Sequence, residues 1–366
     1  MEERKSKIRG MLLGGAVGDA LGYPIEFEPI LEPKTITSYR DGKGLISDDT
    51  QMTLFTANGL LWTYTRGALR GISLLPPDAL YLAYRDWLST QERVEIDEAH
   101  QICWIHDLPE LNQLRAPGNT CLSALRSGKK GTIEDPINNS KGCGSVMRVA
   151  PIAAIKRGDI HEIAMDGAKA GAITHGHPLG VMPCYILVAM LCYILREHQS
   201  IVEALQSAMD LFREKFDAYN DDYKQEMIGI VDRAIELSKR SDLSDLEAIE
   251  SLGGGWVADE ALAIALYSCL KYHNSFKDAV VCAVNHSGDS DSTGAIAGNI
   301  IGTALGVESI PQEYLDGLEL RDVIEELADD LSVDIPVSEY GKNDDKYWLS
   351  KYLYRHRDIS LRKETA

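Results

Sequence analysis

Apolar side chains recur along this chain at the three- and four-residue intervals of an amphipathic helix, and alternating strand patterns are scarce. One helix is predicted to begin at Asp48, with Met52, Phe55 and Leu60 on a single face. Residues 186–194 repeat the pattern in a more apolar helix. Further helices are predicted over 75–91, 160–172, 200–217, 222–240, 256–272 and 275–285, separated by Gly, Pro, Asn or Asp. The pattern predicts an all-α protein.

The length of the chain and the absence of repeats and long linkers favour a single folded domain. The 366 residues, 45% of them hydrophobic, are enough for a sizeable core. No repeat of fixed period occurs, and no long flexible linker divides the chain. We therefore expect a compact single-domain helical bundle over residues 1–366.

The net charge and the cysteine content argue against several classes of protein. A net charge of −19 opposes any general binding to nucleic acid or to anionic membranes. We expect no signal peptide and no segment long enough to span a membrane. The seven cysteines include no CxxC pair, which is typical of reduced thiols in a cytoplasmic protein and indicates neither zinc nor disulfides.

The stretch HSGDSDSTGAIAGNIIGTALG, residues 286–306, places Asp289 and Asp291 at the start of a helix of small and apolar residues. A single Asp at such a position is most often a helix cap, which contributes about 1 kcal/mol. A second acidic pair, Asp48 and Asp49, opens another predicted helix, and no Lys or Arg lies near either pair in sequence. Uncompensated buried carboxylates are costly, so a divalent cation is the economical partner. The all-oxygen ligands Asp, Ser and Thr favour Mg²⁺, Mn²⁺ or Ca²⁺ over zinc.

An EF-hand loop is the competing explanation for this stretch. Asp289, Asp291, Thr293 and Gly294 match the first ligand positions of such a loop. Ile300 stands where the bidentate Glu is needed, and the residues from Gly294 onward have a helical pattern, so the EF-hand is excluded. The remaining ligands must come from elsewhere, and the best candidates are Asp48 and Asp49. Together the two acidic pairs have enough carboxylates for two metal ions.

Two other motifs are weak when taken alone. In GCGSVMR, residues 142–148, Gly142 and Gly144 permit close backbone approach to a ligand, and the following helix start has N–H donors for a phosphate. A plain loop-to-helix turn explains the same residues, because both the dinucleotide and the P-loop fingerprints are incomplete. His175 and His177, in THGHP, are by themselves more typical of a structural turn than of catalysis.

No single motif identifies a protein family, but the whole set in this order does. GDALGYPIEF, SDDTQMT, GCGSVMR, THGHP, GGGWVADEALAIAL and GDSDSTG follow one another between residues 18 and 294. Over roughly residues 8–306 the chain resembles the ADP-ribosylglycohydrolase family, which includes the dinitrogenase-reductase-activating glycohydrolases and the animal ADP-ribosylhydrolases. The resemblance implies a compact all-α fold with a cleft that holds two Mg²⁺ or Mn²⁺ ions.

The resemblance also implies roles for particular residues. The metal ligands it implies are Ser47, Asp48, Asp49, Asp289, Asp291 and Ser292. It assigns catalysis to Glu26, Asp49 and Asp289, with Glu26 orienting a water molecule. It places Gly142, Gly144, Ser145 and His175 near the pyrophosphate and the distal ribose. The chain departs from the family pattern by having Ser for Thr at positions 47 and 292, and Cys143 where Asn is frequent.

The implied activity is hydrolysis of the glycosidic bond between ADP-ribose and an acceptor. Arginine on a modified protein is the first-choice acceptor, and serine, poly(ADP-ribose) or nucleic acid are the alternatives. The counterpart would be an ADP-ribosylating toxin or transferase. A second hypothesis, from a different class, is a protein that only binds ADP-ribose or neutralises a toxin and has lost the chemistry.

Overall fold

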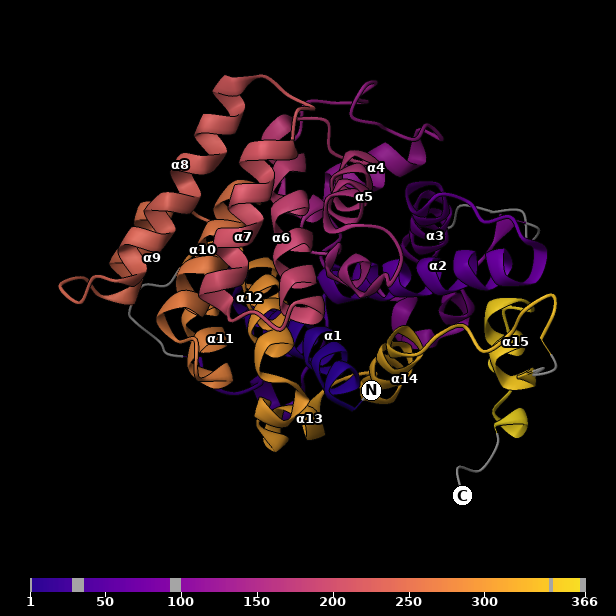
Figure 1. Cartoon of the computed structure of the whole chain (residues 1–366). Coiled ribbons are helices and arrows are strands. Elements are labelled where there is room, and N and C mark those ends of the chain that lie inside the picture. The colour runs from indigo at the N-terminus through magenta and orange to yellow at the C-terminus, as the bar shows by residue number, and fades with distance from the viewer. Residues whose placement is uncertain (1, 28–35, 93–99, 342–344, 363–366) are drawn as a thin grey trace.

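The computed structural model describes residues 2–27, 36–92, 100–341 and 345–362. Within these ranges the regular structure is helical, and the only β-type pairings are two isolated bridges, Gly44 with Leu318 and Gly142 with Val257 (Figure 1). The all-α prediction is confirmed. Buried apolar side chains from Ile8 to Tyr352 form one connected core.

The helices and their bounds are α1 (Glu2–Gly22), α2 (Asp48–Arg70), α3 (Pro76–Gln91), α4 (Asn119–Arg126), α5 (Ile160–Ala172), α6 (Pro178–Arg196), α7 (Ile201–Lys215), α8 (Asp221–Ser238), α9 (Asp245–Leu252), α10 (Ala258–Lys271), α11 (Phe276–Val284), α12 (Ser290–Leu305), α13 (Gln312–Gly317), α14 (Arg321–Ser332) and α15 (Lys346–Tyr352). The six helices predicted with both ends, from 75–91 to 275–285, agree with these bounds to within two residues, whereas α6 begins at Pro178, well before the predicted stretch 186–194.

Local side-chain chemistry fixes several helix starts, including that of α9, a helix that the hydrophobic pattern does not predict. Ser200 and Ser244, before α7 and α9, each accept a hydrogen bond from the backbone N–H of a Glu three residues later, and that Glu side chain bonds back. Asp159 does the same before α5. These capping boxes satisfy N–H groups that the first helical turn leaves unpaired.

Glycines explain why α12 is built from small residues. Gly294, Gly298 and Gly302 recur every four residues along α12, and matching glycines recur along α1, namely Gly10, Gly14, Gly18 and Gly22. A Cβ atom added at Gly18 would lie 1.9 Å from the carbonyl oxygen of Gly294, and one added at Gly298 would lie 2.0 Å from that of Gly14. The two backbones are therefore in direct contact along this face, as Figure 1 shows for the neighbouring helices. This contact brings the end of α1 beside the start of α12.

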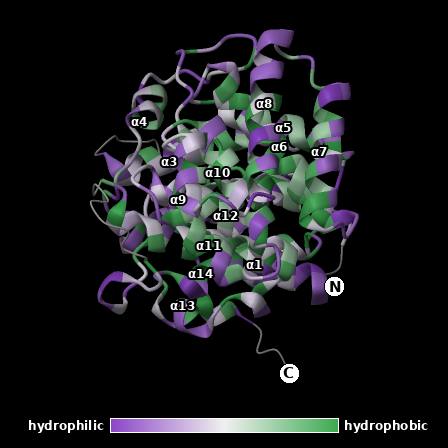
Figure 2. Cartoon of the chain, turned by 90° about the vertical axis from the view of Figure 1, so that its left-hand side faces the viewer, coloured by the Kyte–Doolittle hydropathy of each residue, from purple (hydrophilic) through white to green (hydrophobic). Residues whose placement is uncertain are grey.

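Helix α6 corrects one expectation from the sequence. Residues Pro178–Arg196 are long and apolar enough to cross a membrane by length and composition, so the prediction that no segment reaches that length is wrong. Nearly all of this helix is buried inside the fold, which is the usual environment of the core helix of a helical bundle. Figure 2 shows hydrophobic residues on α6 and α10 and more hydrophilic residues on the peripheral α8 and α13.

Candidate active site

The two acidic pairs lie at the capped starts of α2 and α12. Ser47 caps α2 by accepting a hydrogen bond from the N–H of Asp49, and Asp289 caps α12 by accepting one from the N–H of Ser292 at 3.2 Å. Asp289 is therefore a helix cap through its Oδ1 atom, and this does not prevent its Oδ2 atom from having another role. Since α12 is helical from Ser290, the exclusion of an EF-hand loop is confirmed.

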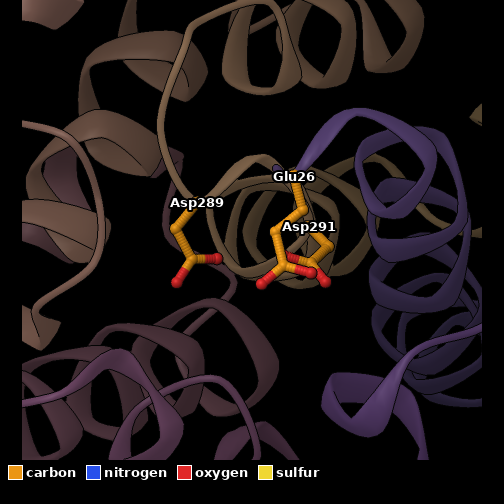
Figure 3. A group of neighbouring side chains, drawn as sticks. All are labelled: Glu26, Asp289 and Asp291. Atoms are coloured by element: carbon orange, nitrogen blue, oxygen red, sulfur yellow. The ribbon is translucent and has the colours of Figure 1, made fainter. Parts of the chain in front are cut away.

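Three carboxylates converge beside the start of α12. Glu26, Asp289 and Asp291 each have an oxygen within 4.8 Å of the others (Figure 3). Glu26 follows α1 in sequence, and the glycine contact between α1 and α12 places it against the two aspartates. All three side chains are buried, with residue exposures of 8%, 3% and 2%.

The pair on α2 completes the acidic cluster. Asp48 accepts a hydrogen bond from the N–H of Gly118 at 3.1 Å and interacts electrostatically with Asp289. Asp49 interacts with Asp289 and with the hydroxyl of Ser292, and its Oδ1 atom is buried without a hydrogen-bond partner among the described residues. We name Glu26, Asp48, Asp49, Asp289 and Asp291 the acidic cluster.

Burial raises the pKa of every member of the acidic cluster, and repulsion between carboxylates adds to this effect at all of them except Asp289. Burial, with repulsion from Asp289 and Asp48, raises the pKa of Glu26 to about 8. Burial likewise raises the pKa of Asp48 to about 8. The pKa values of Asp49 and Asp291 lie well above the ordinary range for the same two reasons. No Lys or Arg among the described residues forms an ion pair with any of these carboxylates.

A divalent cation fits this donor set. Oε2 of Glu26 and Oδ1 of Asp49 are buried oxygens without a hydrogen-bond partner in the described chain. Such oxygens are costly to bury unless something positive contacts them. Carboxylate and hydroxyl oxygens are the ligands preferred by Mg²⁺ and Mn²⁺, so the acidic cluster and the hydroxyls of Ser47 and Ser292 are suited to hold such ions.

We expect the stability of the metal-free protein to fall as the pH rises. The raised pKa of Glu26, about 8 against an ordinary 4.5, means that the folded state keeps a proton that the unfolded chain has already released. The contribution of Glu26 to the free energy of unfolding is fully present below pH 4.5 and is lost as the pH rises through about 8. Excess Mg²⁺ or Mn²⁺ should restore the melting temperature near neutral and alkaline pH, because the cation binds only the folded state.

Calorimetry in chelator and in excess Mg²⁺, at about pH 5 and about pH 8, measures this effect. The gain from the metal should be larger at the higher pH. Equal melting temperatures with chelator and with metal at both pH values would contradict a metal site at the acidic cluster.

Asp19 is a site residue that the sequence did not identify. It is fully buried in α1 and accepts hydrogen bonds from the N–H of Ser47 at 3.0 Å and of Thr50 at 3.1 Å, and from the hydroxyl of Thr50. Burial raises the pKa of Asp19 to about 6 against the effect of these donors. The residue fixes the turn that carries Asp48 and Asp49. Its signal in the sequence was a carboxylate inside an otherwise apolar helix.

Residues 142–145, the glycine loop, lie against the acidic cluster. The N–H of Cys143 donates to the carbonyl of Trp256 at 3.2 Å, and the N–H of Asp289 donates to the carbonyl of Gly254 at 2.8 Å. Residues 254–256 therefore connect the glycine loop to the start of α12 through backbone hydrogen bonds. The thiol of Cys143 donates to Oδ2 of Asp289 at 2.7 Å. The residue that departs from the family pattern thus contacts a member of the acidic cluster directly.

The predicted substrate residues occupy different positions around this loop. His175 is buried beside it, and a Cβ added at Gly142 would lie 3.2 Å from its Nε2 atom. Ser145 is fully buried, and its hydroxyl donates to the carbonyl of Gly142 at 3.1 Å, so its role in binding substrate stays a prediction. His177 accepts a hydrogen bond from the N–H of Leu179 at 3.1 Å and caps α6, as the structural interpretation expects.

Two exposed aromatic rings adjoin the site and were also missed. Phe27 follows Glu26 in sequence, and its ring stacks on that of Trp256 with centroids 5.9 Å apart. The side chains are 71% and 44% exposed. Phe27 ends the GDALGYPIEF motif and Trp256 belongs to the GGGWVADEALAIAL motif, but nothing in either motif indicates that the two rings meet.

Comparisons with known proteins match nearly the whole chain. The model of the ADP-ribosylglycohydrolase family matches residues 1–340. The chain is 25% identical to the ADP-ribosyl-[dinitrogen reductase] glycohydrolase of Rhodospirillum rubrum, over 85% of this chain and 90% of that protein. It is 26% identical to the ADP-ribosylarginine hydrolase Tri1 of Pseudomonas putida, over 90% of this chain and 79% of that protein.

A solved structure titled an ADP-ribosylglycohydrolase-related protein complex has the same fold, with a TM-score of 0.62 and 23% sequence identity, over 91% of this chain and 99% of the other. The motif set, the acidic cluster and the family model together support one conclusion. The chain belongs to the ADP-ribosylglycohydrolase family and is a hydrolase of glycosidic bonds.

Proposed function

We propose that this hydrolase removes ADP-ribose from arginine side chains of modified proteins with the help of two Mg²⁺ or Mn²⁺ ions. The observation that carries the proposal is a buried acidic cluster without cationic partners, directly beside a glycine loop. The name of the Tri1 relative, an ADP-ribosylarginine hydrolase, supports the choice of arginine.

The metal ions would be held by the acidic cluster together with Ser47 and Ser292. When bound, such ions supply Lewis-acid stabilisation and lower the pKa of a bound water molecule. The Oε2 atom of Glu26 is buried without a protein partner, so this carboxylate, held ionised by the bound cations, would be placed to accept a proton from the attacking water. A bond would then form between the water oxygen and the anomeric carbon while the bond to the acceptor nitrogen breaks; the guanidinium of the substrate takes the electron pair of that bond and leaves as a neutral guanidine, which solvent protonates. The negative charges of Asp49 and Asp289 would offset the rest of the positive charge of the bound ions.

The glycine loop would bind the negatively charged end of the substrate. The acidic cluster repels a pyrophosphate, so close backbone approach at Gly142 and Gly144 and the N–H of Gly144 are needed to bind it nearby; the N–H of Gly142 already donates to the hydroxyl of Ser140 at 3.3 Å. Both glycines adjoin His175, which is a neutral donor or acceptor at this position.

Replacing Gly142 by Ala tests this part of the site. Its φ of −55° is accessible to Ala, so the backbone is not strained, but the added methyl group lies 3.2 Å from Nε2 of His175. We expect the affinity for ADP-ribose to fall about tenfold, with metal affinity unchanged. Gly229→Ala, on α8 with nothing within 4 Å of the added methyl, is the matched control. If calorimetry shows that Gly142→Ala binds ADP-ribose as tightly as the wild type does, the glycine loop is not part of the binding site.

The acceptor is identified by comparing substrates. The protein would be incubated with arginine-, serine- and nucleic-acid-linked ADP-ribose, and released ADP-ribose quantified by mass spectrometry. Fastest release from the arginine linkage is expected, and faster release from serine or nucleic acid would replace arginine as the acceptor. Binding of ADP-ribose without release from any substrate would favour a binding or toxin-neutralising protein.

The cellular setting follows from the same proposal. The source of the modification would be an ADP-ribosylating toxin or transferase acting on a protein target. All seven cysteines are free in the structure, and six of them are buried, which supports a reducing compartment such as the cytoplasm. The net charge of −19 supports the absence of general nucleic-acid binding.

A further inference from the structure

Arg148, at the end of the GCGSVMR motif, is fully buried and has no carboxylate partner among the described residues. Its guanidinium donates to the carbonyl of Gly144 at 2.7 Å and lies over the ring of Tyr84, 4.4 Å from the centroid. Nη2 also donates to the hydroxyl oxygen of Thr174 at 2.6 Å. The side chain therefore joins the glycine loop to the residue that precedes His175.

The hydroxyl of Thr174 has a defined direction because of this contact. Arginine has only donors, so the Thr174 oxygen must accept from Arg148. The same oxygen lies 2.8 Å from Nδ1 of His175. Two acceptors lie near the hydroxyl proton in the described chain, Nδ1 of His175 and the sulfur of Cys121, and the ring nitrogen is much the stronger acceptor of the two. The hydroxyl therefore donates to Nδ1, and the ring proton of a neutral His175 resides on Nε2.

His175 is neutral in this environment. Burial, with the positive charge of Arg148 nearby, holds the pKa of His175 well below its usual range. Nε2 faces the glycine loop, where a Cβ at Gly142 would approach it to 3.2 Å and one at Gly144 to 3.7 Å. No hydrogen-bond partner for Nε2 is found in the described part of the chain.

We propose that Thr174, held by Arg148, is a positioning residue that fixes His175 as the Nε2–H tautomer, so that the imidazole presents a neutral hydrogen-bond donor beside the glycine loop. The acceptor would be a phosphate or ribose oxygen of the ligand, and this assignment rests on the proposed function. With the opposite tautomer, Nε2 would direct a lone pair at the same oxygen and repel it. Thr174 touches neither substrate nor metal in this account and acts through His175.

The tautomer is measured directly, without any ligand. A long-range ¹H–¹⁵N spectrum of the imidazoles, with His175 assigned by its loss in His175→Gln, distinguishes the two neutral forms. We expect the Nε2–H form in the wild type and in Thr174→Ser, which keeps the hydroxyl. In Thr174→Val the donor to Nδ1 is lost, and a mixture or the Nδ1–H form is expected. An Nδ1–H form in the wild type, or an unchanged tautomer in Thr174→Val, would overturn the proposal.

Affinity for ADP-ribose gives a second readout. Thr174→Val should bind about tenfold more weakly than the wild type, while Thr174→Ser binds nearly as the wild type does. Thr303→Val is the matched control, because its buried hydroxyl donates only to the carbonyl of Asn299 within α12. It should leave both the tautomer and the affinity unchanged, although it also loses one buried hydrogen bond.

The two readouts separate this proposal from the proposed function. If the wild type fails to bind ADP-ribose, the assignment of the loop to that ligand fails, and the ligand-free spectrum still decides the role of Thr174. If the wild type binds ADP-ribose but Thr174→Val binds equally well, the positioning role is wrong and the proposed function stands. Affinity for Mn²⁺ should be equal in all these variants.

Discussion

Asp291→Asn is expected to remove nearly all hydrolysis of ADP-ribosylated substrate while the protein remains folded. Asp291 is 2% exposed, and its carboxylate faces Glu26 and Asp289 within 4.8 Å. Asn has a neutral carbonyl where a hard divalent cation requires an anion. Loss of residues that only support metal ligands costs about 10- to 100-fold, so loss of a ligand should lower turnover by more than about a hundredfold. Turnover and Mn²⁺ affinity are the measurements.

The stability of the same variant separates a ligand from a structural residue. Removing one buried like charge relieves repulsion, so metal-free Asp291→Asn should melt at or above the temperature of the metal-free wild type near pH 8. Asp316→Asn, an exposed residue of α13 that pairs with Arg321, is the control and should retain full turnover. If Asp291→Asn has the turnover and the metal affinity of the wild type, Asp291 is not a metal ligand and the start of α12 has only a structural role.

Asp48→Asn should reproduce the loss from the other end of the acidic cluster. Asp48 lies on α2, and its charge interacts with that of Asp289 across the site. Combining it with Asp291→Asn should cost much less than the sum of the two losses, as expected of residues that act as one unit. Simple additivity would indicate two unrelated sites.

Glu26→Gln is expected to lower turnover by about 10²- to 10⁴-fold while ADP-ribose still binds, because the variant removes a proton acceptor and conserves shape. The buried Oε2 of Glu26 has no protein partner, and bound cations would keep this carboxylate ionised and able to accept a proton near neutral pH. Initial rates and calorimetric titration with ADP-ribose would separate the two effects.

Glu313→Gln provides the matched control for this substitution. Glu313 is exposed on α13 and pairs with Lys277, so the same chemical change should leave turnover and binding intact. Full activity in Glu26→Gln would exclude Glu26 from the mechanism and leave Asp49 and Asp289 as the candidates for proton transfer.

The local parts of this structure could be predicted from the sequence. Helices α5, α7 and α9 begin at capping boxes, which are visible as Asp or Ser followed three residues later by Glu. The acidic pairs could be recognised because carboxylates at the start of an apolar helix lack a compensating charge. The motif order supplied the family, which the family model confirms.

The tertiary parts could not be predicted in the same way. The glycines of α1 and α12 are each visible, but no periodic signal states that Gly18 lies against Gly294. Asp19 acts through Ser47 and Thr50, which are remote in sequence, and Arg148 acts through Thr174 in another loop. Such contacts depend on the packing of whole helices, whereas caps and turns depend on neighbours in sequence.

The most direct measurement of the central claim is release of ADP-ribose from an ADP-ribosylarginine protein, followed by mass spectrometry with Mg²⁺ and again with chelator. The account predicts release by the wild type in Mg²⁺, loss of release in chelator, recovery when Mg²⁺ or Mn²⁺ is restored, and no release by Asp291→Asn under any of these conditions. Equal release in Mg²⁺ and in chelator, or release by Asp291→Asn at the wild-type rate, would contradict it.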